Sequence, residues 1–287
     1  MKPALPILTV LLAIVALWYG AAVWLNSAWT HDQAARAGTT VTVAEVLRDT
    51  MEQDRPVLPA PHQVLAGLWQ GVAGQAVTSK RSLVYHGWVT LSATLLGFVI
   101  GTGLGIVLAI GIVHNKAMDL SVMPWAIASQ TIPILAIAPM VIVVLASLNV
   151  TGIVPKSIIS AYLSFFPVVV GMVKGLRSPD GMQLDLLRTY GASPAQTLWK
   201  LRLPASVPYL FASLKVSIAA SLVGAIVGEL PAGASAGLGA RLLSGSYYGQ
   251  TIQIWAALFA AAILAAGLVM IVGAAERLTL ARMGMGR

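Results

Sequence analysis

Long apolar stretches constrain this chain more than any other feature of its sequence. Six of them are long enough to cross a bilayer as helices, which takes about 20 apolar residues. They lie near Leu5–Asn26, Trp88–Val113, Val122–Leu148, Ile153–Val173, Val207–Val227 and Ile252–Ala275. Only 10% of the 287 residues are charged, against about a quarter in a soluble domain. We therefore predict an all-α membrane protein with six transmembrane helices in a lipid bilayer.

The apolar stretches divide the chain into three parts. We expect a first transmembrane helix at 1–26, a polar segment at 27–87 and a core of five helices at 88–287. The first stretch exceeds the apolar core of a cleaved signal peptide, so we interpret it as a retained span. Within the polar segment, Thr42–Glu52 predicts a short helix. His62–Val72 predicts an amphipathic helix, which we interpret as resting on the bilayer surface in preference to forming a binding site.

Lysine and arginine predict the orientation, because they are enriched in short cytoplasmic loops. If the N-terminus is cytoplasmic, the short outer loops hold only Lys156 and Arg241. The inner segments then hold Lys2, Lys116, Lys174, Arg177, Arg188, Lys200, Arg202, Arg277, Arg282 and Arg287. We therefore expect both termini in the cytoplasm and residues 27–87 on the periplasmic side.

The longest inner loop, 175–206, has the pattern of two helices joined at a glycine. Ser178-Pro179 predicts an N-cap followed by proline at the first helical position, and this helix should end at Gly191. Ser193-Pro194-Ala195-Gln196 predicts a second N-cap with a capping box, and the second helix should end before Pro204.

The second loop helix also has a predicted apolar side, formed by Thr197, Leu198 and Trp199. Such a side could fill a groove on a partner protein. A structural connector between two spans fits the composition of this loop equally well.

The same loop resembles the EAA loop of permeases from binding-protein-dependent ABC importers. In that pattern Glu-Ala-Ala precedes a glycine, a hydrophobic residue and Leu-Pro; Asp185 here takes the place of the glutamate, and Leu186 and Leu187 replace the alanines. The resemblance implies a coupling helix over Gly191–Leu201 that docks in a groove of an ATPase subunit. The implied coupling residues are Asp185, Arg188, Gly191, Ala192, Ser193, Gln196, Thr197, Trp199, Leu203 and Pro204.

Other segments resemble the nitrate, sulfonate and taurine subgroup of these permeases, from about Leu58 to the C-terminus. They are Leu58-Pro59-Ala60-Pro61, Ser129-Gln130-Thr131-Ile132-Pro133, Ala138-Pro139, Phe165-Phe166-Pro167, and Glu229 followed by Gly237-Leu238-Gly239. The subgroup often has Trp-Phe-Gly-x-Gly after the third span, where this chain has Leu145–Val150. That departure leaves the cargo open between a sulfonate, taurine or nitrate and, as the alternative, a nitrogen heterocycle such as a pyrimidine vitamin precursor.

The resemblance also implies an assembly in the bacterial inner membrane. The chain would pair with a second, identical permease copy and bind two ATPase subunits, which would hold ATP and Mg, and a periplasmic solute-binding protein would deliver the cargo. The chain itself has no Gly-x4-Gly-Lys-Ser/Thr loop, so ATP hydrolysis needs a separate subunit and the chain is not expected to be an enzyme or to bind a cofactor.

Three other functional classes are less well supported by the sequence. An ion-coupled carrier or channel would be expected to show a charge relay or two similar halves, and neither is present. Gly233–Gly237 matches the Gly-x-Ser-x-Gly motif of hydrolases, but all four histidines precede it, so we interpret it as a flexible outer loop. A nucleic-acid partner is not expected, because the net charge of +8 forms no basic face interleaved with aromatic residues.

The absence of cysteine excludes disulfides and thiolate metal sites.

A few residues inside the predicted spans are candidates for the transport pathway. Lys215 and Glu229 are ionisable groups in or near the fifth span, where charge indicates function. The alternatives are that Lys215 extends its ammonium group to the membrane surface and that Glu229 caps the outer end of the helix. Gln130 and Thr131 precede Pro133, whose missing N–H frees backbone carbonyls.

Gly97, Gly101 and Gly105 recur every four residues and predict a ridge for close helix packing, within the chain or between two copies.

Overall fold

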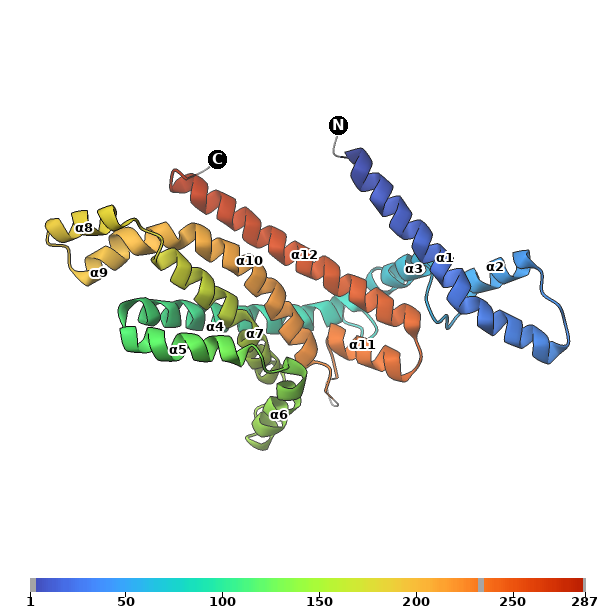
Figure 1. Cartoon of the computed structure of the whole chain (residues 1–287). Helices are drawn as coiled ribbons and strands as arrows, with labels where there is room; N and C mark the ends of the chain where they lie inside the picture. The colour runs from blue at the N-terminus through green and yellow to red at the C-terminus, as the bar shows by residue number, and fades with distance from the viewer. Residues whose placement is uncertain (1–3, 232–234, 286–287) are drawn as a thin grey trace. The chain divides into compact units, whose positions relative to one another are not determined.

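The computed structural model describes residues 4–231 and 235–285, and every regular element in these residues is a helix (Figure 1). The helices are α1 (Ala4–Ala37), α2 (Val43–Glu52), α3 (Pro61–Val72), α4 (Leu83–His114), α5 (Lys116–Ser129), α6 (Ile134–Ser147), α7 (Ile153–Leu176), α8 (Gly181–Thr189), α9 (Pro194–Thr197), the π-helix η1 (Leu198–Arg202), α10 (Leu203–Gly228), α11 (Leu238–Tyr247) and α12 (Thr251–Arg282). Lys2, Gly233, Ala234 and Arg287 lie outside the described residues. The chain forms two compact units: unit 1 is Met1–His86 with Ala240–Ala261, and unit 2 is Gly87–Gly239 with Ala262–Arg287.

Five helices in the described part of the chain are long and apolar enough to cross a membrane. They cover Leu5–Ala37, Leu83–His114, Ile153–Leu176, Pro194–Gly228 and Thr251–Arg282. A sixth span is formed only if α5 and α6 count as one, because these helices meet at a bend of 98°. The all-α membrane fold is therefore confirmed, but the prediction of a single helix over Val122–Leu148 is wrong.

The break between α5 and α6 has a local cause at Pro133. Proline disfavours helical geometry at the residue before it and cannot donate to the carbonyl four residues back. That carbonyl, on Ser129, accepts a hydrogen bond from the Tyr162 hydroxyl instead. The Thr131 hydroxyl donates to the Ala128 carbonyl at 2.7 Å. The carbonyls freed at the break thus find new donors, as the interior of a membrane requires.

Helix α7 forms the centre of unit 2. Its side chains Phe165, Val168 and Met172 are buried in one apolar cluster with Ala109 and Ile112 of α4. Buried serines also join α7 to its neighbours: the Ser217 hydroxyl donates to the Ser164 carbonyl at 2.7 Å, and the Ser160 and Ser221 hydroxyl oxygens lie 2.6 Å apart. Small and hydroxyl side chains allow membrane helices to approach closely.

The glycine ridge of α4 faces α7. A β-carbon added at Gly97 would meet Ser160, one at Gly101 would meet Ser164, and one at Gly105 would lie 2.8 Å from the β-carbon of Val168. These glycines lie at a helix contact within the chain.

In unit 1, α1 extends beyond the predicted span and holds the segment before α3. The Asn26 side chain exchanges two hydrogen bonds with the backbone of Leu58, at 2.9 and 3.1 Å, and the Trp18 indole donates to the Pro59 carbonyl at 3.0 Å. The Thr30 hydroxyl donates to Asp49 of α2 at 2.6 Å. This bond, together with one from the Gln53 amide, holds the pKa of the Asp49 carboxyl below its usual value.

The two short helices expected in the polar segment are present as α2 and α3. Thr42 caps α2 and forms a capping box with Glu45. On α3, Val64 is buried while Leu65 and Trp69 are 65% and 72% exposed. The apolar side expected for α3 is therefore divided between the interior of unit 1 and the surface.

Candidate functional site

The predicted inner loop begins with α8, but its cap differs from the prediction. Asp180 is the N-cap, and its backbone N–H donates to the side chain of Gln183 at 3.3 Å. The prediction of Ser178 as the cap is wrong, because its hydroxyl donates to the Gly175 carbonyl at 2.7 Å and so completes the last turn of α7.

Gly191 ends the first arm of the loop as predicted. Its φ of +69° lies in the left-handed region, which only glycine adopts without strain. The N–H groups of Gly191 and Ala192 donate to the carbonyls of Arg188 and Leu187, both at 2.9 Å. These two carbonyls at the C-terminal end of α8 therefore have hydrogen-bond donors. Asp185 and Arg188 pair with each other at 3.1 Å on the exposed surface, where an ion pair contributes at most about 1 kcal/mol.

The second arm starts at the predicted cap but does not end where expected. Ser193 and Gln196 form the capping box: the Ser193 N–H donates to the Gln196 side-chain oxygen at 2.8 Å, and the Gln196 N–H donates to the Ser193 hydroxyl at 3.2 Å. Pro204 does not terminate the helix, because the wider turn of η1 precedes it: the N–H of Leu203 donates to the carbonyl of Leu198, five residues back. A π-turn makes room for a proline ring that would clash with a regular α-turn. Pro194–Gly228 is consequently one helix of 35 residues.

The two arms, α8 and then α9 with η1, lie at one end of unit 2 (Figure 1). The Arg202 guanidinium donates to the Leu176 carbonyl at 2.9 Å, which braces η1 against the end of α7. Leu198 and Leu203 pack against the apolar cluster of unit 2. The predicted apolar side is thus divided, because Leu198 faces inward while the neighbouring Trp199 is exposed.

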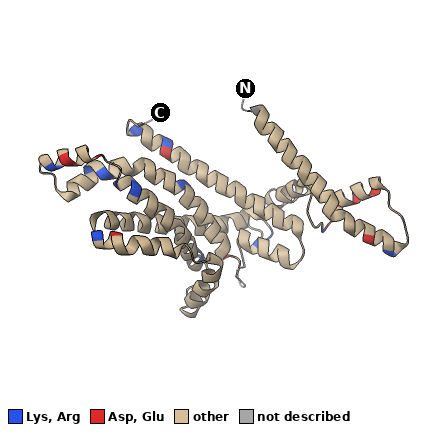
Figure 2. Cartoon of the chain, in the orientation of Figure 1, with Lys and Arg blue, Asp and Glu red and all other residues tan. Residues whose placement is uncertain are grey.

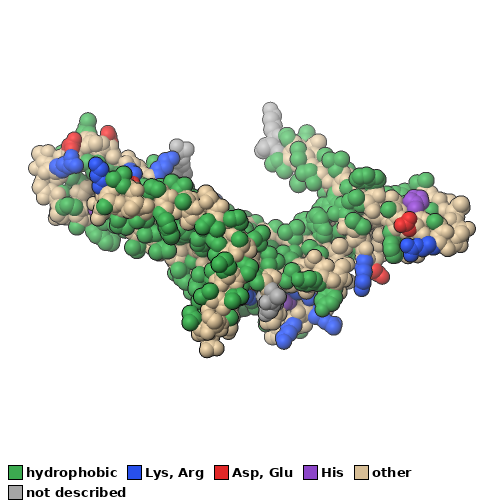
Figure 3. Space-filling view, turned by 60° about the horizontal axis from the view of Figure 1, so that its bottom comes forward, with side chains coloured by type: hydrophobic (Ala, Val, Ile, Leu, Met, Phe, Trp, Pro, Cys, Tyr) green, Lys and Arg blue, Asp and Glu red, His purple; other side chains and the backbone are tan. Residues whose placement is uncertain are grey.

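The outer surface of this loop is an exposed mixture of apolar and charged side chains (Figure 3). No residue of α8, α9 or η1 is buried. The exposed large apolar side chains are Met182 (79%), Leu186 (56%), Tyr190 (81%) and Trp199 (70%). In unit 2 the basic residues gather at this same end (Figure 2). The loop is therefore rigid on its inner side and available for contact on its outer side.

The structure does not bring the candidate pathway residues together. Gln130 and Thr131 lie at the break before Pro133, and Gln130 donates to the Ser129 hydroxyl at 3.3 Å. Lys215 of α10 forms an ion pair with Glu276 of α12. No hydrogen bond or ion pair joins these residues to Glu229 within 4–231 and 235–285. Glu276 was not among the predicted pathway residues, because it lies just past the predicted end of the last span, at Ala275.

Glu229, which directly follows α10, is completely buried. Its carboxylate accepts hydrogen bonds from the Thr90 hydroxyl at 2.9 and 3.0 Å and from the Gly239 N–H at 2.9 Å. The Lys156 ammonium lies 3.7 Å away and also donates to the Ala236 carbonyl at 2.9 Å. This cluster fixes the described part of the 230–239 loop. Glu229 is thus fully engaged within the fold.

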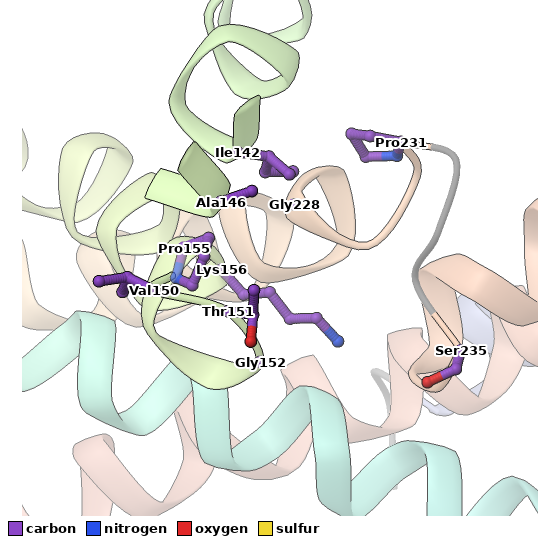
Figure 4. A pocket seen from close by; sticks show the side chains of 10 residues that line it. All are labelled: Ile142, Ala146, Val150, Thr151, Gly152, Pro155, Lys156, Gly228, Pro231 and Ser235. Carbon is purple, nitrogen blue, oxygen red and sulfur yellow. The ribbon is translucent and has the colours of Figure 1, made fainter. Parts of the chain in front are cut away.

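A cavity of about 280 Å³ adjoins this cluster (Figure 4). Ile142 and Val150 line one part of it, and the Lys156 side chain extends in the direction of Ser235. Ser235 is the central residue of the motif shared with hydrolases. The cavity contains no histidine among its lining residues.

Comparisons with known proteins agree with these features. Residues 101–284 match the family described as binding-protein-dependent transport system inner membrane component. A probable ABC transporter permease protein of Haemophilus influenzae is 31% identical over 69% of this chain and 78% of its own length. The riboflavin transport system permease protein RibX of Chloroflexus aurantiacus is 30% identical over 77% of this chain and 79% of its own length.

The fold also matches a solved structure. The structure described as inward-facing conformations of the MetNI methionine ABC transporter superposes with a TM-score of 0.56 at 22% identity, covering 68% of this chain and 95% of the matched chain. The family match over residues 101–284 includes the whole of the 175–206 loop. The chain therefore belongs to the family of inner membrane components of binding-protein-dependent transport systems: it is a permease subunit of an ABC importer, a transport component and not an enzyme.

Proposed function

We propose that the loop from α8 to η1 couples this permease to its ATPase subunit. The observation that carries the proposal is the rigid link between the loop and the membrane: α9, η1 and α10 form one helix, so a displacement of the loop is transmitted directly to a span. Trp199 and Tyr190 supply exposed aromatic side chains of the kind that anchor protein interfaces. Gly191 sets the angle between the two arms.

The assembly proposed here contains two copies of this chain and two ATPase subunits, with ATP and Mg bound by the ATPase. A periplasmic solute-binding protein delivers the cargo on the opposite side. The basic end of unit 2 faces the cytoplasm in this arrangement, because lysine and arginine are enriched there in membrane proteins. Both termini are then cytoplasmic.

The cargo is proposed to be a small polar solute that passes between the two copies, with Gln130 and Thr131 at the α5–α6 break lining the path. The resemblance in sequence favours a sulfonate, taurine or nitrate, and one relative is the putative aliphatic sulfonates transport permease protein SsuC of Bacillus subtilis, at 26% identity over 72% of this chain.

A nitrogen heterocycle is the second candidate, and the charge balance of unit 2 supports it. Lys156 and Lys215 each pair with a glutamate, so neither is free to bind an anionic cargo. The formylaminopyrimidine transport permease protein ThiX of Halalkalibacterium halodurans is 30% identical over 56% of this chain. Uptake assays with labelled taurine and a labelled aminopyrimidine distinguish the two classes.

Co-purification tests the coupling proposal. Trp199→Ala should weaken binding of the ATPase subunit by about tenfold or more, since aromatic anchors dominate such interfaces. Trp125→Ala is the matched control, because Trp125 of α5 is similarly exposed at 68% but lies outside the loop. Equal recovery of the ATPase with the Trp199→Ala variant and the parent chain would refute the coupling assignment.

A further inference from the structure

Unit 1 contains a polar cavity that neither the coupling loop nor the pathway uses. It measures about 710 Å³ and is lined by the segment before α3, by α3, by the turn between α3 and α4, by the first residue of α4, by α11 and by the start of α12. The charged residues that line it are Asp54, Arg55, Arg81 and Arg241. Three arginines against one aspartate leave the cavity with a formal net charge of +2.

The arginines of the cavity lack carboxylate partners. The ion pairs formed by the described residues involve other side chains, so Arg55, Arg81 and Arg241 have no carboxylate oxygen within 4.0 Å. Arg241 Nε is buried and has no hydrogen-bond partner among the described residues. Burial, and then the positive charge of Arg81, lowers the pKa of the Arg241 guanidinium. The Arg241 side chain as a whole is half-buried, so it is the Nε–H donor that is withdrawn from solvent. A buried donor without a partner is costly, and proteins rarely retain one without a use for it.

The frame around Arg241 is well ordered by hydrogen bonds. The Gln253 amide of α12 donates to the Arg241 carbonyl and to the Ser244 hydroxyl, both at 3.3 Å, which fixes this turn of α11. Gln70 and Gln250 also line the cavity and can each offer two N–H donors. Arg81 comes from the turn before α4 and Arg241 from α11, so the two guanidinium groups belong to different elements.

We propose that this cavity binds an oxyanion group of the phosphate or sulfonate kind, held by Arg241 and Arg81. Guanidinium groups bind such groups through paired, charge-assisted hydrogen bonds. Two arginines and several amides supply more N–H donors than a carboxylate, with only two oxygens, can accept. A phosphate or sulfonate group, with three or more oxygens, uses them better. The same chemistry is found in a phospholipid headgroup and in a free anionic solute. The inference does not depend on the coupling assignment.

Titration of the purified permease–ATPase complex tests the site. The probes are inorganic phosphate, methanesulfonate and a short-chain phosphatidylglycerol, each measured by calorimetry at low salt, where such contacts are least screened. We expect at least one probe to bind, and Arg241→Gln and Arg81→Gln to weaken its affinity by about tenfold or more. Binding by phosphatidylglycerol alone identifies a lipid headgroup; binding of phosphate or methanesulfonate identifies a free solute.

Lys80→Gln is the matched control, because it removes the same charge next to Arg81 without altering the lining of the cavity. Its affinity for the probe should stay within about twofold of the parent, since the exposed charge is screened. Arg241→Lys keeps the charge but loses the paired donors, so it should bind several-fold more weakly even if Arg241→Gln fails to fold. The site is refuted if no probe binds the parent, if Arg241→Lys and Arg81→Gln both bind normally, or if Lys80→Gln loses as much affinity as the arginine variants.

Discussion

Glu229 is the most completely enclosed charged residue in the described part of unit 2, and its partners come from three separate segments. Thr90 belongs to α4, Lys156 to α7 and Gly239 to the first turn of α11. Removal of the carboxylate would take away the acceptor of the Thr90 hydroxyl and of the Gly239 N–H, and the counter-charge of the Lys156 ammonium. The residue therefore ties the outer loop to the helices, although its sequence position alone suggested a place in the pathway.

Replacement of Glu229 tests this structural role. Glu229→Leu leaves the Lys156 ammonium without its buried counter-charge, and we expect a loss of about 3–5 kcal/mol in the free energy of unfolding. The double variant Lys156→Met with Glu229→Leu should be more stable than Glu229→Leu alone, because the unpaired charge is gone. Thermal unfolding of the purified complex measures both. A double variant that is less stable than Glu229→Leu would contradict the proposed pairing.

The glycines of α4 allow a comparison at the level of one methyl group. A β-carbon at Gly101 would lie 2.8 Å from the Ala161 carbonyl oxygen, whereas one at Gly103 would have no atom within 4 Å. Gly101→Ala should therefore destabilise the protein by about 1–3 kcal/mol through overpacking. Gly103→Ala should be neutral or slightly stabilising, because alanine favours helix. The melting temperatures of the two variants measure this difference in stability, and equal values would show that Gly101 does not pack against α7.

At the scale of elements, local signals in the sequence were the most informative. The capping box at Ser193 and the left-handed Gly191 depend on residues within a single turn of helix, and both were predicted. Proline was less informative, because its effect depends on the surrounding turn. Pro133 breaks a helix at 98°, while Pro204 follows a π-turn inside a continuous helix.

The hinge at Gly191 can be tested against a proline in the same loop. Gly191→Pro cannot adopt a φ of +69° and removes the N–H that donates to Arg188. We expect ATP-driven uptake to be lost while the protein remains in the membrane. Gly181→Pro is the control, since Gly181 is the first residue of α8, where proline is tolerated. Uptake at the parental rate by Gly191→Pro would contradict the hinge.

The break between α5 and α6 makes a second prediction at this scale. Pro133→Ala restores a backbone N–H four residues after Ser129 and removes the steric restriction on Ile132, so the two helices should tend to join. We expect uptake to fall several-fold. Pro124→Ala, which changes a proline inside the uninterrupted α5, should leave uptake close to the parental rate. If both variants transport normally, the bend has no role in the pathway.

At the scale of the whole molecule, the helices that can cross the membrane could be predicted from the length and composition of the apolar stretches. The contacts between them could not, because they join residues far apart in the chain. Lys215 pairs with Glu276, and Ser160 with Ser221. Neither pairing leaves a periodic trace in the sequence. The cavity around Arg241 could not be predicted for the same reason, since its lining comes from four helices and from the segments that connect them to their neighbours.

The topology can be tested directly because the chain contains no cysteine. Single cysteines at Thr40 and Ala195, both exposed, should react with a membrane-impermeant maleimide from opposite sides of the membrane. This follows from the gathering of basic residues at the end of unit 2 that carries α9. Labelling of both positions from the same side of intact, inverted vesicles would overturn the proposed orientation.

We expect this chain to transport solute only when an ATPase subunit is docked on the α8–η1 loop. The most direct measurement is the purification of the tagged chain from its native membrane, followed by assays of ATP hydrolysis and of solute uptake in liposomes. We expect an ATPase subunit to co-purify in equal amount, the complex to hydrolyse ATP and uptake to require ATP. A chain that purifies alone and still moves solute without ATP would contradict it.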